Sequence, residues 1–121
     1  MRVFREHCFA NCRITGIAIP GSVRHIEKAA FKDCPLFRLH FDPDGILELI
    51  GTEAFMRTYV TELVTPRELK YIGKRAFQKT LMYELELNEG LEEIDDRCFQ
   101  GTQIMKMNVP KTLKRIGDSA L

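Results

Sequence analysis

The stretch Ile72-Gly73-Lys74-Arg75-Ala76-Phe77-Gln78-Lys79-Thr80 decides the fold, because related stretches recur along the chain. They begin at Ile26, Ile50 and Ile94, and a phenylalanine keeps the same place in each. Spacings of 22, 24, 22 and 22 residues separate the members of this column, Phe9, Phe31, Phe55, Phe77 and Phe99. Repeats of this length are typical of solenoids, in which each repeat forms one coil that packs against its neighbours.

Two local patterns predict the structure within a repeat. The alternation in Leu85-Glu86-Leu87 predicts a short strand with its apolar residues pointing inward. Ile72, Ala76 and Phe77 fall at positions i, i+4 and i+5, so we expect a helical turn there. Each repeat is therefore expected to hold one short strand, a turn, a second extended piece and one helical turn. The residues expected to point inward from these strands are apolar in every repeat except at Thr65.

The one longer repeat has an identifiable insertion. Its two additional residues fall within Asp42-Pro43-Asp44-Gly45, a combination typical of a tight turn. Additional residues in a surface turn cost little conformational entropy, so we expect the inward columns to stay in register.

Several segments, together with the Ile-Pro or Val-Pro pairs that precede some of them, resemble BspA-type leucine-rich repeats. The segments are IEKAAFKDC (26–34), IGTEAFMRT (50–58), IGKRAFQKT (72–80) and IDDRCFQGT (94–102). The resemblance covers nearly all of residues 3–121. It implies an α/β solenoid: a curved leucine-rich-repeat right-handed superhelix of about five coils, forming a single domain over residues 1–121. It further implies a protein-interaction or adhesion module, since family members are typically surface or secreted proteins that bind host proteins or other cells.

The composition and the ends of the chain add further expectations. The formal net charge is +1, so neither nucleic acid nor an anionic membrane is an expected partner. No apolar run approaches the roughly 20 residues that span a bilayer, and no signal peptide is evident at the start. The resemblance implies a cell-surface or secreted location, with a cytoplasmic one as the alternative. The periodicity starts at Phe4 and stops at Leu121 without capping sequences, so we expect a fragment of a longer array.

The positions of the four cysteines favour a role in core packing over a role as reactive or metal-binding thiols. Cys8 and Cys98 occupy the small-residue column before the phenylalanine, so we expect both to be buried. Cys12 and Cys34 lie one repeat apart in a column that elsewhere holds threonine, and a disulfide between them stays open.

No enzymatic or metal site is expected. A zinc site built from His7, Cys8, Cys12 and His25 would lack regular ligand spacing. The chain has no glycine-rich phosphate loop, and the resemblance brings no catalytic motif or cofactor. We therefore expect a binding protein rather than an enzyme.

The outward positions of the predicted strands, which we call the strand face, vary in chemistry while the inward columns stay uniform. Large apolar side chains beside mixed charges are typical of protein-binding surfaces. Two alternatives to a protein-binding surface stay open. The strand face could be an ordinary solvated sheet on a structural spacer within a longer array, or the chain could be an intracellular scaffold that self-associates through uncapped ends. The candidate protein-binding residues are Phe37, Arg38, His40, Glu62, Tyr83, Glu84, Glu86, Met105 and Lys106.

Overall fold

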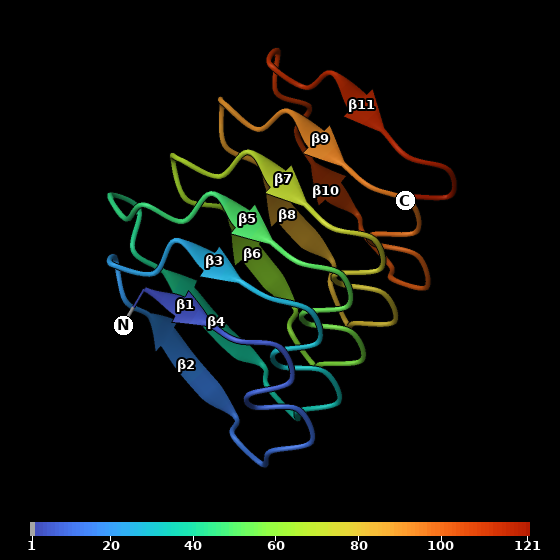
Figure 1. Ribbon diagram of the computed structural model, residues 1–121. Helices are drawn as coiled ribbons and strands as arrows, with labels where there is room; N and C mark the ends of the chain where they lie inside the picture. Colours follow the sequence, from blue (N-terminus) through green and yellow to red (C-terminus); the bar gives the residue numbers. More distant parts are fainter. Residues whose placement is uncertain (1) are drawn as a thin grey trace.

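The computed structural model describes residues 2–121 as a stack of coils with strands on two opposite sides (Figure 1). One side carries a continuous parallel sheet in the order β1-β3-β5-β7-β9-β11. Its strands are β1 (Val3–Phe4), β3 (His25–Ile26), β5 (Leu49–Ile50), β7 (Tyr71–Ile72), β9 (Glu93–Ile94) and β11 (Arg115–Ile116). These two-residue strands are the second extended piece expected in each repeat.

The opposite side carries the strands expected from the alternating pattern, divided between two sheets. One sheet pairs β2 with β4, and the other has the order β10-β8-β6. The strands are β2 (Gly16–Ile19), β4 (Arg38–Phe41), β6 (Glu62–Val64), β8 (Glu84–Glu86) and β10 (Lys106–Met107). No helix among residues 2–121 is long and apolar enough to cross a membrane.

The core follows from parallel, in-register stacking of equivalent residues. Ile72 pairs with Ile94, 22 residues later, whereas Ile26 pairs with Ile50 across the longer repeat. The predicted register is thus preserved through the insertion. The phenylalanine rings stack along the axis, with centroids 5.0 to 5.5 Å apart from Phe9 to Phe99.

The expected helical turn is wrong, since residues 2–121 contain no helix. The segment from 73 to 80 and its equivalents form runs of turns, which we call the turn side. Within the coil, the Ala76 N–H donates to the Gly73 carbonyl at 3.1 Å. The next amide leaves the coil, and the Phe77 N–H donates to the Cys98 carbonyl at 2.9 Å.

Backbone conformation explains why this segment is not helical. Arg75 and Lys79 both have positive φ, at 56° and 58°, which a right-handed helix excludes. Such conformations cost a non-glycine residue on the order of 1–3 kcal/mol. They turn alternate amides toward the neighbouring coil, where the Arg75 N–H donates to the Asp96 carbonyl at 3.0 Å. The turn run buries the same residues that a helical turn would bury.

The polar exception in the inward columns is satisfied by hydrogen bonds. Thr65 is buried, and its hydroxyl donates to Asn88 Oδ1 at 2.8 Å. The Asn88 N–H donates back to Thr65 Oγ1 at 2.8 Å, and the Asn88 amide reaches the Leu69 carbonyl at 2.9 Å. A threonine is tolerated at this position because the next coil supplies a matching asparagine.

Candidate functional site

The strand face brings together all nine residues that the sequence singled out, and all nine are exposed. The strands hold them in ladders, because equivalent positions of paired strands lie opposite each other. Glu62 is opposite Glu84, and Glu84 is opposite Lys106. In the next ladder, Val64 is opposite Glu86. The structure thus gathers these side chains on one surface; whether they bind a protein stays a prediction.

Three large apolar side chains stand at one edge of the strand face. Phe37, Tyr83 and Met105 are 47%, 41% and 86% exposed. Each immediately precedes a strand, and its backbone N–H bonds to the preceding coil at 2.8 to 2.9 Å. The backbone fixes their positions while the side chains remain accessible, which suits them as anchors for a ligand.

Polar contacts orient two of these aromatic rings. The Arg38 guanidinium lies 5.2 Å from the centre of the Phe37 ring, within the range of a cation–π contact. The Tyr83 hydroxyl donates a hydrogen bond of 2.5 Å to Glu62 Oε1. This bond to a carboxylate raises the pKa of Tyr83 above its ordinary value.

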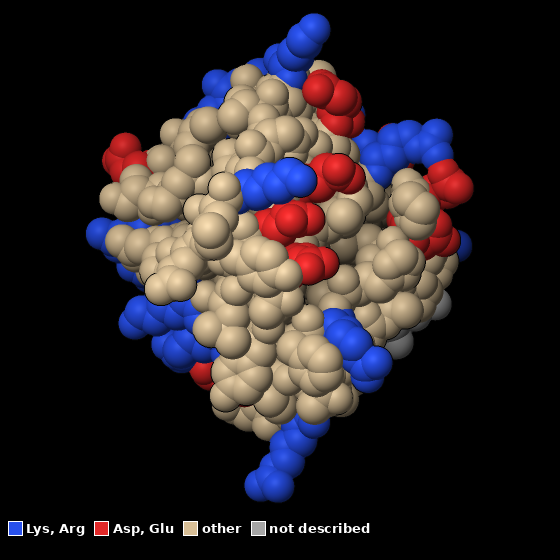
Figure 2. Space-filling model, turned by 180° about the vertical axis from the view of Figure 1, so that it is seen from behind, with Lys and Arg blue, Asp and Glu red and all other residues tan. Residues whose placement is uncertain are grey.

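The charged side chains of the strand face lack ion-pair partners within residues 2–121, although the other faces are rich in such pairs. Lys106 and Glu84 occupy opposed positions without forming an ion pair. On the turn side, by contrast, Arg57 binds Asp33 in the preceding coil, with Nε 2.6 Å from Oδ1. Figure 2 shows the molecule from the side of β2, β4, β6, β8 and β10, with acidic side chains grouped near its centre.

A groove of about 760 Å³ crosses the strand face where β4 and β6 are not paired. Arg38 and His40 line it from β4, and Glu62 and Val64 line it from β6. The break coincides with the longer repeat, whose two additional residues follow β4 directly. Volumes of this order are typical of ligand-binding clefts.

The insertion itself forms a well-defined turn. The Asp44 N–H donates to Asp42 Oδ1 at 2.9 Å, and the Gly45 N–H donates to the Asp42 carbonyl at 3.0 Å. Arg67 of the following coil pairs with Asp44. Gly45 approaches the preceding coil so closely that a Cβ there would lie 2.9 Å from the Gly21 Cα. This side of the groove is therefore held by specific contacts.

The groove and several exposed apolar side chains were not predicted from the sequence. Val64 lies in an outward ladder but was not among the candidate residues. Tyr59 and Leu81 are also exposed, one position after the buried threonines of the turn side. The insertion after β4 was the available signal for the groove, although it does not by itself reveal that strand pairing stops.

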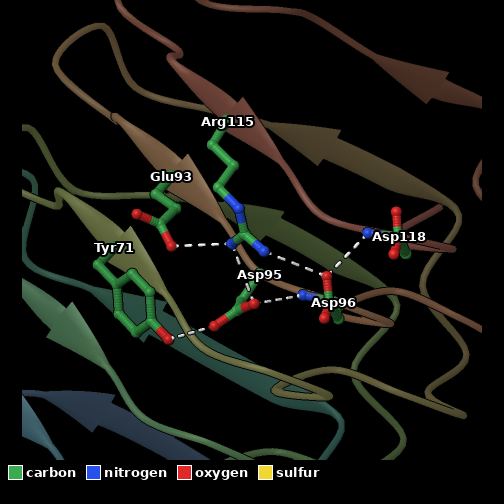
Figure 3. Close-up of polar contacts among 6 residues, drawn as sticks. All are labelled: Tyr71, Glu93, Asp95, Asp96, Arg115 and Asp118. Atoms are coloured by element: carbon green, nitrogen blue, oxygen red, sulfur yellow. Dashed lines mark hydrogen bonds and ion pairs between the residues drawn. The ribbon is translucent and has the colours of Figure 1, made fainter.

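A second polar cluster lies on the six-stranded side and joins its last three coils (Figure 3). Arg115 of β11 donates to Glu93 at 2.9 Å and to Asp95 at 3.1 Å, while the Tyr71 hydroxyl donates to Asp95 at 2.6 Å. The hydrogen bonds from Tyr71 and Arg115 lower the pKa of Asp95. Because its donors and acceptors satisfy one another, we assign this cluster a structural role.

The cysteines differ from the expectation at one position. Cys98 is buried, as expected, but Cys8 is exposed, because no coil in the structure packs outside the one that contains it. Cys12 and Cys34 are free thiols, and the Cys34 thiol donates to the Phe9 carbonyl at 2.7 Å. Within residues 2–121, no three histidine, cysteine or acidic side chains are grouped to hold a metal ion.

Comparison with known proteins agrees with this geometry. Residues 2–121 match the model of the "BspA type Leucine rich repeat region (6 copies)". No curated protein matches the chain in sequence.

Solved structures show the same architecture. The pneumococcal vaccine antigen PcpA is 27% identical with a TM-score of 0.85, over 96% of this chain and 32% of PcpA. A leucine-rich cell surface protein from Faecalibacterium prausnitzii A2-165 is 20% identical with a TM-score of 0.68, over 99% of this chain and 40% of that one. The leucine-rich repeat protein of T. pallidum is 22% identical with a TM-score of 0.69, over 96% and 66%. The chain thus spans about a third of the length of PcpA.

Proposed function

The chain belongs to the BspA-type leucine-rich repeat family, and from this premise we propose that it is a protein-interaction module that binds a protein ligand through its strand face. The observation that carries the proposal is the contrast between faces. Many charged side chains elsewhere pair between neighbouring coils, whereas none of those on the strand face has an ion-pair partner in residues 2–121. Unpaired charges beside exposed aromatic rings are suited to a ligand that supplies the missing partners.

We propose a location at the cell surface or outside the cell, where the module would serve adhesion. The family supports this location, as does the likeness to PcpA, which is described as a vaccine antigen. An antibody against the chain should label intact cells. Labelling only after the cells are lysed would contradict this location.

Selection from a phage-displayed library of random dodecapeptides tests binding through the strand face. We expect peptides that bind the chain to lose most of their affinity for a Phe37→Ser and Tyr83→Ser double variant, because exposed aromatic anchors dominate such interfaces. A Lys28→Ser and Lys74→Ser variant on the turn side is the matched control and should bind normally. Loss of binding in the control instead would mean that the functional face is on the turn side.

Exposed apolar side chains favour self-association as a second candidate function. Ile116 of β11 and Leu121 are 46% and 61% exposed, in columns whose members are buried from Ile26 to Phe99. Apolar surface of this kind stabilises a complex when another chain covers it. Sedimentation should then show association at micromolar concentration, and polar substitution of Ile116 should weaken it. A monomer throughout that range would contradict this candidate.

A further inference from the structure

Two opposite charges occupy equivalent positions of neighbouring coils and face away from each other. Arg38 and Glu62 are the first residues of β4 and β6. They form no ion pair. The Arg38 side chain lies over the Phe37 ring and extends toward the preceding coil. It comes so close to Gly16 that a Cβ added to this glycine would lie 3.3 Å from Arg38 Nε.

Glu62 is engaged in the other direction. It accepts the hydrogen bond from Tyr83, which belongs to the following coil. Strand β4 therefore supplies a basic side chain to the groove, and β6 supplies an acidic one. Both charges remain exposed, so neither has lost its capacity to bind a further group.

Accessible apolar surface lies beside these charges. Val64 of β6 lines the groove and is 60% exposed, whereas Leu63 points inward and is nearly fully buried. Because β4 and β6 are unpaired, the groove is open across the strand face. Accessible apolar surface beside two opposite charges matches a short extended chain that carries both charges and an apolar side chain.

We propose that this groove binds an extended peptide segment of a partner protein, which presents an acidic side chain to Arg38, a basic side chain to Glu62 and an apolar side chain to Val64. The proposal rests on the proposed function of the strand face. The mixed charges of the groove and its surroundings favour a peptide over a nucleic acid. A nucleic acid would bring phosphates close to Glu62, Glu84 and Glu86, and like charges at an interface are unfavourable.

A charge-reversal experiment tests the proposal. The probe is the dodecapeptide most enriched on the unmodified chain, labelled with fluorescein and measured by fluorescence anisotropy. It should contain both an acidic and a basic residue. Glu62→Lys should weaken its binding about tenfold or more. Replacing the basic residue of the peptide with glutamate should restore binding to Glu62→Lys. Replacing the acidic residue of the peptide with lysine should restore binding to Arg38→Glu.

The matched control reverses charges on two neighbouring coils at a position away from the groove. Arg24 and Glu48 form an exposed ion pair, with Nε 3.6 Å from Oε1, so Arg24→Glu combined with Glu48→Arg keeps the net charge and the pair. This variant should bind the probe as the unmodified chain does. Circular dichroism melts should show that every variant is folded.

The outcomes separate this inference from the proposed function. If Glu62→Lys and Arg38→Glu bind as the control does, while the Phe37→Ser and Tyr83→Ser variant does not bind, the groove inference is wrong and binding through the strand face stands. The same holds if the enriched peptides lack either charge. If no peptide is enriched on the chain, both the inference and the proposed function are contradicted.

Discussion

Phe55 and Phe77 stack with their ring centroids 5.0 Å apart and their planes 6° from parallel. Both rings are fully buried, and each continues into the next ring of the column. The rings lie between the two strand-bearing sides and the turn side. They therefore fix the spacing of coils on which the ladders of the strand face depend.

The Phe77→Ala variant should be strongly destabilised. Removal of a buried phenylalanine ring typically costs about 3–5 kcal/mol, and a chain of this size has only about 5–15 kcal/mol of stability. Urea unfolding measures the change in the free energy of unfolding. Phe37→Ala is the control, since its exposed ring should contribute little. A Phe77→Ala variant as stable as the control would show that the ring column is not the core.

Thr58 and Thr80 occupy the same column but differ in their hydrogen bonds. The Thr58 hydroxyl donates to the Phe55 carbonyl at 2.8 Å, whereas the buried Thr80 Oγ1 has no hydrogen-bond partner among residues 2–121. We expect Thr58→Val to lower the free energy of unfolding by about 1–2 kcal/mol and Thr80→Val to be neutral or stabilising. Equal losses in the two variants would mean that Thr80 is hydrogen-bonded in solution.

Thiol labelling should distinguish the four cysteines. Cys8 is exposed, so a thiol reagent should label it rapidly in the folded chain. Burial raises the pKa of Cys98, so that thiol should react only after denaturation. A Cys8→Ser variant should lose the rapid phase. Denatured, unreduced chain should yield all four thiols, and a missing pair would indicate a disulfide between Cys12 and Cys34.

The Arg115 cluster predicts a specific response to acid. The pKa of Asp95 is lowered in the folded chain by Tyr71 and Arg115, so ionised Asp95 stabilises the fold above its ordinary pKa. That contribution should be lost progressively as the pH falls below about 5. Asp95→Asn should therefore lower the melting temperature at pH 7 and make its decline with acidification shallower.

Asp118→Asn is the control for the acid response, because Asp118 joins this cluster through its backbone N–H, which donates to Asp96. Its melting temperature should follow that of the unmodified chain at every pH. If Asp95→Asn shows the same steep decline as the unmodified chain, Asp95 does not couple the fold to pH.

The repeat spacing predicted the columns, the register and the exposure of the strand face, because stacking places equivalent residues on top of one another. It did not predict the turn side correctly. Ile72, Ala76 and Phe77 point inward both in a helical turn and in a run of turns, so side-chain periodicity cannot distinguish the two. The distinction lies in the backbone, where Arg75 has positive φ and its amide bonds to the next coil.

The groove and the Arg115 cluster could not be predicted for a different reason. An insertion at Asp42–Gly45 predicts a turn, but the loss of pairing between β4 and β6 depends on two neighbouring coils together. Tyr71, Asp95 and Arg115 come from three coils and share no motif. Their contact depends on side-chain orientation, which the repeat pattern leaves undetermined.

Mapping of amide chemical shifts tests binding through the strand face most directly. The chain labelled with ¹⁵N is titrated with the selected dodecapeptide and followed by two-dimensional NMR. We predict that the largest shifts fall on β4, β6 and β8 and on the residues before them, including Phe37 and Tyr83. Largest shifts on the turn side, around Lys28 and Lys74, would contradict it.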